Sequence, residues 1–164
     1  WQYSKAQVGL AFTPSPVLSA FVAVFGGRWA DRHGFRGIMA LAAVVATVGF
    51  FWLYLFMGEE PDFLFAFFPA SLMFGFGMGI LASQLNSAAL RDIPPEATAT
   101  ANGIHQSLRY AIGGMGAATA ITILNGSHSV ARYDVMWCLL GVLMLLVAPL
   151  MLFAYPKHST LGNN

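Results

Sequence analysis

The chain has 164 residues, of which 57% are hydrophobic and only 9% are charged, whereas an average soluble domain carries roughly 25% charged residues. So few charges cannot keep the surface of a protein of this size in water, and the composition therefore excludes an ordinary soluble domain. The net charge of +1 says little by itself, because in a membrane protein the placement of charge matters more than its sum.

Several segments are long and apolar enough to cross a bilayer, which takes about 20 mostly apolar residues. The five candidates run over residues 8–29, 38–57, 63–90, 97–124 and 135–155. No segment shows the alternation of a β-strand, and an open sheet could not span lipid because its edge groups would stay unpaired. We therefore predict an all-α integral membrane fold with five transmembrane helices, followed by a tail over residues 156–164.

The first span contains Pro14 and Pro16. Each proline removes a backbone donor, so we expect a kink in this helix. The chain starts at Trp1, and its first residues lack the basic and then apolar pattern of a signal peptide. We expect the chain to be the C-terminal part of a longer protein and to require the missing N-terminal half as its partner.

The loop after the first span has the pattern G-x-x-x-D-R-x-G-x-R. Its defining positions are Gly27, Asp31, Arg32, Gly34 and Arg36. Gly34 permits a tight turn, and Asp31 stands at a helix end, where its carboxylate can pair with an arginine or face the N-terminus of a neighbouring helix. Such a pair can hold one conformation and release it in another. An ordinary charged loop is the alternative interpretation.

Basic residues predict the orientation, because cytoplasmic loops are enriched in Lys and Arg. Alternation of the spans puts most of these residues on one side, namely Arg28, Arg32, Arg36, Arg91 and Lys157. The other side has only Lys5 and Arg132. The pattern places loop 28–37 and the tail 156–164 in the cytoplasm, and the acidic loop 58–62 outside.

Small residues recur every four positions in the third span. They are Ser71, Gly75, Gly79, Ser83 and Ser87. Such a stripe lets a neighbouring backbone approach closely. The fourth span also has closely spaced small residues, namely Gly113, Gly116, Ala117 and Ala120. We therefore expect both helices to pack tightly along these faces.

The fourth span also carries the polar side chains that are the best functional candidates. They are Asn102, His105, Gln106 and Arg109. Polar groups within hydrocarbon are costly and usually face the bundle interior or a water-filled path, so we predict that these four line a substrate or proton pathway. Interhelical hydrogen bonding is the alternative, and we favour it for Gln84 and Asn86 of the third span.

Three stretches resemble the major facilitator superfamily of secondary transporters. The first is the loop motif, although Phe35 stands where that family usually has a basic residue. The second is residues 2–10, followed by Pro14, and the third is residues 101–114, with Arg109 before paired glycines. The last two are similar to the fourteen-helix drug/proton antiporter branch, and the order of all three fits the C-terminal half of such a helical bundle.

The resemblance implies a secondary active transporter in the plasma membrane, or the inner membrane if the source is bacterial. Its expected activity is proton-coupled efflux of drugs or other amphipathic small molecules, with the lipid bilayer, a small-molecule substrate and protons as partners. No acid lies well inside a span, so the main proton carrier is expected in the missing half. We expect no catalytic residue, cofactor, metal or nucleic acid. A transporter of a metabolite or nutrient is the alternative, and an integral-membrane enzyme or scaffold is one of another class.

Overall fold

The computed structural model describes residues 3–90, 93–124 and 130–153 of the chain, and these residues are overwhelmingly helical. The helices are α1 (Lys5–Phe12), α2 (Pro14–His33), α3 (Phe35–Phe56), α4 (Phe68–Leu90), α5 (Thr98–Leu124) and α6 (Val130–Phe153). One π-helical turn, η1 (Phe63–Phe67), leads into α4, and a 3₁₀ turn, η2 (Pro95–Ala97), leads into α5. The prediction of an all-α fold is confirmed. Arg91 and the tail 156–164 lie outside the described residues.

Four helical segments are long and apolar enough to cross a membrane. They are Lys5–His33, Phe35–Phe56, Phe63–Leu90 and Val130–Phe153. Within the first, α1 ends at Phe12 and α2 starts at Pro14, so the expected break at the prolines is present. The fourth predicted span corresponds to α5, which has 27 residues. Helix α5 is about as long as these four segments, but it is more polar.

The centre of the fold is α4, which packs between α2 and α3 at very short range. A Cβ added to Gly75 would lie 2.6 Å from the carbonyl oxygen of Ser15 on α2, and one added to Gly79 would lie 2.7 Å from that of Ser19. On another face of α4, a Cβ at Gly77 would lie 2.7 Å from a carbonyl oxygen of α3. The backbones therefore touch where the sequence has no side chain, as the stripe in the third span predicted.

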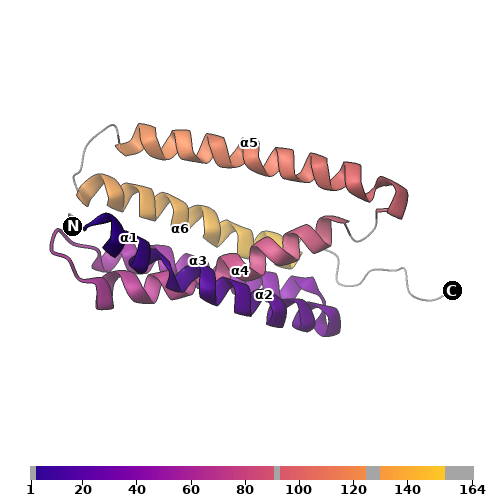
Figure 1. The fold of residues 1–164 in the computed structure, drawn as a ribbon, viewed down its shortest axis with the longest axis horizontal. Coiled ribbons are helices and arrows are strands. Elements are labelled where there is room, and N and C mark those ends of the chain that lie inside the picture. Colours follow the sequence, from indigo (N-terminus) through magenta and orange to yellow (C-terminus); the bar gives the residue numbers. More distant parts are fainter. Residues whose placement is uncertain (1–2, 91–92, 125–129, 154–164) are drawn as a thin grey trace.

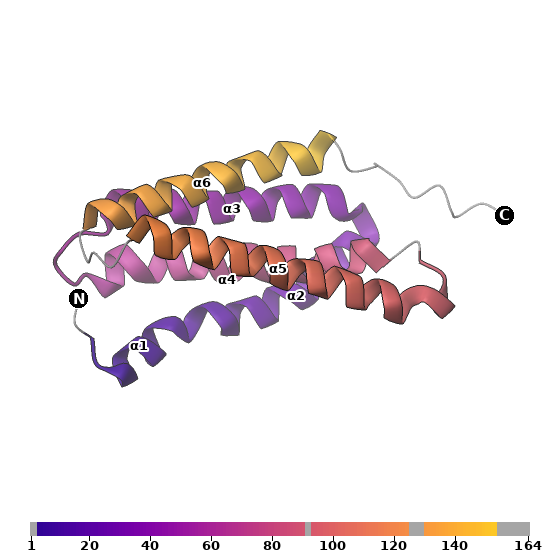
Figure 2. The same cartoon turned by 90° about the horizontal axis from the view of Figure 1, so that it is seen from above.

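The remaining helices flank this three-helix core. Helix α6 lies along α3. Figure 1 shows α5 as a separate layer, and Figure 2 shows that this layer lies over α4. The largest fully buried side chains are Met39 and Leu53 of α3 and Ile80 of α4. No residue of α5 is buried, and Cβ atoms at Gly113, Gly114 and Gly116 would meet nothing within 4 Å. The close packing expected along α5 is therefore absent within the described residues.

We predict that Gly79→Ala destabilises the whole protein by roughly 1–3 kcal/mol, because the added methyl group would force α4 away from α2. The matched control is Gly37→Ala in the first turn of α3, where an added Cβ would meet nothing within 4 Å. Alanine is the better helix former, so the control should unfold at the same temperature as the parent or a higher one. The measurement is the thermal unfolding midpoint in detergent. Equal midpoints for both variants would contradict the packing described here.

Candidate functional site

The first candidate site is the turn between α2 and α3, which consists of a single residue. Gly34 has φ 84° and ψ 158°, a conformation that is essentially restricted to glycine. Its N–H donates to the carbonyl oxygen of Ala30 at 2.8 Å and so closes the last turn of α2. Helix α3 begins at the next residue. The tight turn expected at Gly34 is therefore present, and it fixes how the two helices enter the membrane.

The charges around this turn remain accessible. Asp31 and Arg32 are exposed and Arg36 is half-buried. Within the described part of the chain, none of the three forms an ion pair in this conformation. The pairing of Asp31 with an arginine therefore stays a prediction about another conformation or about a residue outside these ranges.

The first glycine of the motif lies at the contact between α2 and α4. A Cβ at Gly27 would lie 3.8 Å from Nε2 of Gln84, and one at Gly26 would lie 3.7 Å from the same atom. Gln84 is only 2% exposed, and its Nε2 donates to Oγ of Ser83 at 3.0 Å. The prediction of an interhelical hydrogen bond for Gln84 is therefore wrong for this amide nitrogen, which donates within its own helix. The amide still packs against α2, in the space that Gly26 and Gly27 leave open.

The second candidate site is the polar face of α5. Asn102, His105 and Gln106 are half-buried, and Arg109 is exposed one turn further along. At 100° per residue, these four positions fall within an arc of about 100° around the helix axis. The structure therefore places all four predicted pathway residues on one face, with His105 and Gln106 at the edges of the arc and Arg109 between them.

Several polar atoms of α5, and one of α4, are buried without a hydrogen-bond partner in the described part of the chain. They are Oδ1 of Asn102, Nδ1 of His105 and Oε1 of Gln106 on α5, and Oδ1 of Asn86 on α4. An unsatisfied buried polar atom costs roughly 1–3 kcal/mol. Such a cluster is stable only where water, a ligand or another part of the protein completes the hydrogen bonds.

The chemistry that these side chains offer is that of hydrogen bonding and binding. Among the described residues, no group of three or more His, Cys, Asp or Glu side chains could hold a metal ion. The α5 face offers amide, imidazole and guanidinium groups that donate or accept hydrogen bonds. It can therefore bind a polar solute or conduct water through an apolar bundle.

The comparisons with known proteins agree with a membrane protein that binds solutes. The family model of the Major Facilitator Superfamily matches residues 1–163. The chain is 27% identical to the riboflavin transporter RibZ of Clostridioides difficile, over 57% of this chain and 20% of that protein. It is 29% identical to the lincomycin resistance protein LmrB of Listeria monocytogenes, over 73% of this chain and 25% of that protein. It is 23% identical to the multidrug export protein EmrB of Escherichia coli, over 77% of this chain and 25% of that protein.

The chain thus spans about a quarter of the length of these relatives. No solved structure matches it at a significant level.

We predict that Gly34→Leu opens the α2–α3 turn, because a side chain is strained by about 1–3 kcal/mol at this backbone conformation. Cleavage by trypsin after Arg32, in membrane vesicles that expose this face, should become roughly tenfold faster, since proteolysis follows the population of the open form. Gly37→Leu is the matched control, because its position has open space and an ordinary helical backbone. If both variants are cleaved at the same rate, the strain assigned to Gly34 is absent.

Proposed function

Because the chain belongs to the Major Facilitator Superfamily, we propose that the whole protein is a secondary active transporter that exports drugs or other amphipathic small molecules in exchange for protons. The chain itself is an integral membrane protein, with four helices able to cross a bilayer. The observation that carries the proposal is the polar face of α5, whose partly buried groups lack hydrogen-bond partners within the described part of the chain.

Arg109 is the centre of the proposed pathway. It is the eleventh residue beyond Thr98, so at 1.5 Å per residue it lies about 17 Å along a helix roughly 40 Å long. An arginine at such a depth costs at least ~2.5 kcal/mol on insertion scales, and a leucine there would insert better. Stability therefore does not explain why an arginine stands at this position, whereas the binding of a ligand does. We propose that the guanidinium binds a polar or anionic group of the substrate or pairs with the carboxylate that carries the proton.

The other residues of this face have supporting roles in the proposal. Asn102 and Gln106 orient the solute through their amides, and His105, one turn from Arg109, relays protons along the face. The α2–α3 turn acts as the conformational latch, with Asp31 exchanging partners as the two halves of the transporter rock around a midplane site. The acid that carries most of the protons lies in the rest of the protein.

A specific observation favours each of two substrate classes. Relatives named for lincomycin resistance and multidrug export support drug efflux, whereas the riboflavin transporter supports a metabolite. The whole protein reconstituted into proteoliposomes with an imposed pH gradient separates them. Lincomycin transport that depends on the gradient supports the proposal. Transport of riboflavin alone would replace drug efflux by the second candidate.

We predict that Arg109→Gln lowers proton-linked lincomycin transport about tenfold or more, which corresponds to the loss of a charge-assisted hydrogen bond worth ~1.5–3 kcal/mol. Arg109→Lys should keep measurable transport, since it retains the charge and loses only the planar fork. Ser107→Ala changes a polar residue of α5 that lies off the polar face, and it should transport like the parent. Unchanged transport by Arg109→Gln, inserted at normal levels, would remove Arg109 from the pathway.

A further inference from the structure

A cavity of about 450 Å³ lies at the end of the bundle opposite the Gly34 turn. It is partly open, and it is lined by residues of α1, the segment that follows α3, the end of η1 and the beginning of α6. No helix α5 residue lines it, so it is separate from the polar face that contains Arg109. Its volume falls within the roughly 300–1,000 Å³ of typical small-molecule sites. The sequence did not predict this cavity, because its walls come from distant parts of the chain.

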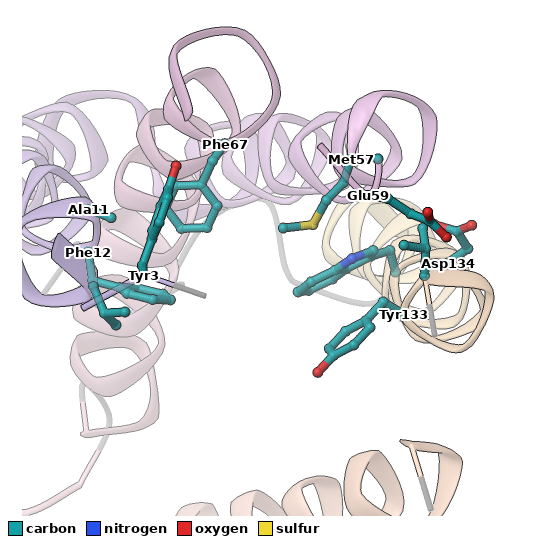
Figure 3. A pocket seen from close by; sticks show the side chains of 12 residues that line it. Tyr3, Ala11, Phe12, Met57, Glu59, Phe67, Tyr133 and Asp134 are labelled. Atoms are coloured by element: carbon teal, nitrogen blue, oxygen red, sulfur yellow. The ribbon is translucent and has the colours of Figure 1, made fainter. Parts of the chain in front are cut away.

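Aromatic side chains form two of the cavity walls. On one side, Phe12 of α1 and Phe67 of η1 meet edge to face with ring centroids 5.3 Å apart. On the other side stand Tyr133 and Trp137 of α6, and Trp137 is stacked on Phe50 of α3 at 6.3 Å. Figure 3 shows Phe12 and Phe67 across the cavity from Tyr133. A ligand between these walls would have rings on both sides.

The wall around η1 is held in place by its own hydrogen bonds. Oδ1 of Asp62 accepts from the backbone N–H of Phe65 at 3.0 Å. Nε1 of Trp52 donates to the carbonyl oxygen of the same residue at 2.9 Å. The backbone N–H and C=O of Phe65 are thus both held by hydrogen bonds, and they fix the turn that carries Phe67 two residues further on. A rigid wall lowers the entropy cost of binding a ligand.

The charged residues that line the cavity are both acids, Glu59 and Asp134. Figure 3 shows their carboxylates on the same side of the cavity. The nearby Arg132 does not line the cavity. Its Nη1 instead donates to the carbonyl oxygen of Ile123 on α5 at 3.0 Å. Among the described residues, the lining therefore includes two acids and no basic side chain.

Two lining groups are buried and lack a hydrogen-bond partner within the described ranges. They are Oδ1 of Asp134 and Nε1 of Trp137. The residues are three positions apart on α6, so their side chains share one face of the helix. One group is an acceptor with negative charge and the other is a donor. A ligand that satisfies both must carry a cationic donor and a nearby acceptor.

We propose that this cavity binds an amphipathic organic amine, whose ring lies between the aromatic walls and whose ammonium group meets Asp134 and Glu59. Tyrosine and tryptophan faces attract a cation, and an oxygen of the ligand accepts from Nε1 of Trp137. A metal ion fits poorly, since Ca²⁺ takes six to eight oxygen ligands and the cavity offers two carboxylates. Binding here does not depend on transport, so its test stands apart from that of the α5 pathway.

The test is calorimetric binding of propranolol to the purified whole protein at pH 7. This probe has a naphthyl ring, a hydroxyl oxygen and a secondary ammonium group, and N-acetylpropranolol is its neutral counterpart. We expect propranolol to bind at least tenfold more tightly than N-acetylpropranolol. No measurable binding of propranolol, or equal affinity for the two probes, would overturn the proposal.

Substitutions of the two lining acids test whether propranolol binds in this cavity. Asp134→Asn and Glu59→Gln keep the shapes of the side chains and remove their charges, and each should weaken propranolol binding at least tenfold. Glu60→Gln is the matched control, because this neighbouring acid does not line the cavity, and it should bind like the parent. Parental affinity in Asp134→Asn, or in Glu59→Gln if the first variant does not fold, would overturn the proposal.

Discussion

The close approach of α4 to its two neighbours is the constraint on which the rest of the structure depends. Lipid tails are as apolar as leucine, so membrane helices associate mainly through van der Waals packing and interhelical hydrogen bonds. Gly75 and Gly79 bring the α2 backbone into contact, and Gly77 does the same for α3. Because the two contacts lie on different faces of α4, the three helices form one unit. The end of α2 and the start of α3 are then joined by the single residue Gly34.

Helix α5 differs from this unit in both packing and polarity. It has no buried residue, and it carries buried polar atoms that have no hydrogen-bond partner among the described residues. In the alternating access that we propose, the polar face of α5 changes its partners while the packed core keeps its shape. At the opposite end from Gly34, the same core supports the acidic aromatic cavity through Phe50 and Trp137.

Much of the fold could be predicted from the sequence, because apolar runs and prolines act locally. The helices, the break at Pro14, the α2-facing stripe of α4 and the turn at Gly34 all follow from residues close together in the chain. The acidic aromatic cavity could not be predicted, since Phe12, Glu59 and Asp134 meet only in the folded bundle. The spacing of the glycines in α5 is typical of a packed helix face, yet no neighbour lies against them in the described residues. Spacing alone therefore could not predict which helix face is packed. The four polar α5 residues share one face because helical periodicity alone places them there, whereas their role in a pathway stays a prediction.

The proposed water-filled path along the polar face of α5 is tested most directly by cysteine accessibility along this helix. Single cysteines would be placed at Asn102, His105 and Gln106, and at Ile104, Leu108 and Met115 on the apolar side, in the whole protein lacking Cys138. The account predicts that a membrane-impermeant thiol reagent modifies the first three readily and the last three slowly. Reactivity that is equal on both faces, or confined to the apolar side, would contradict it.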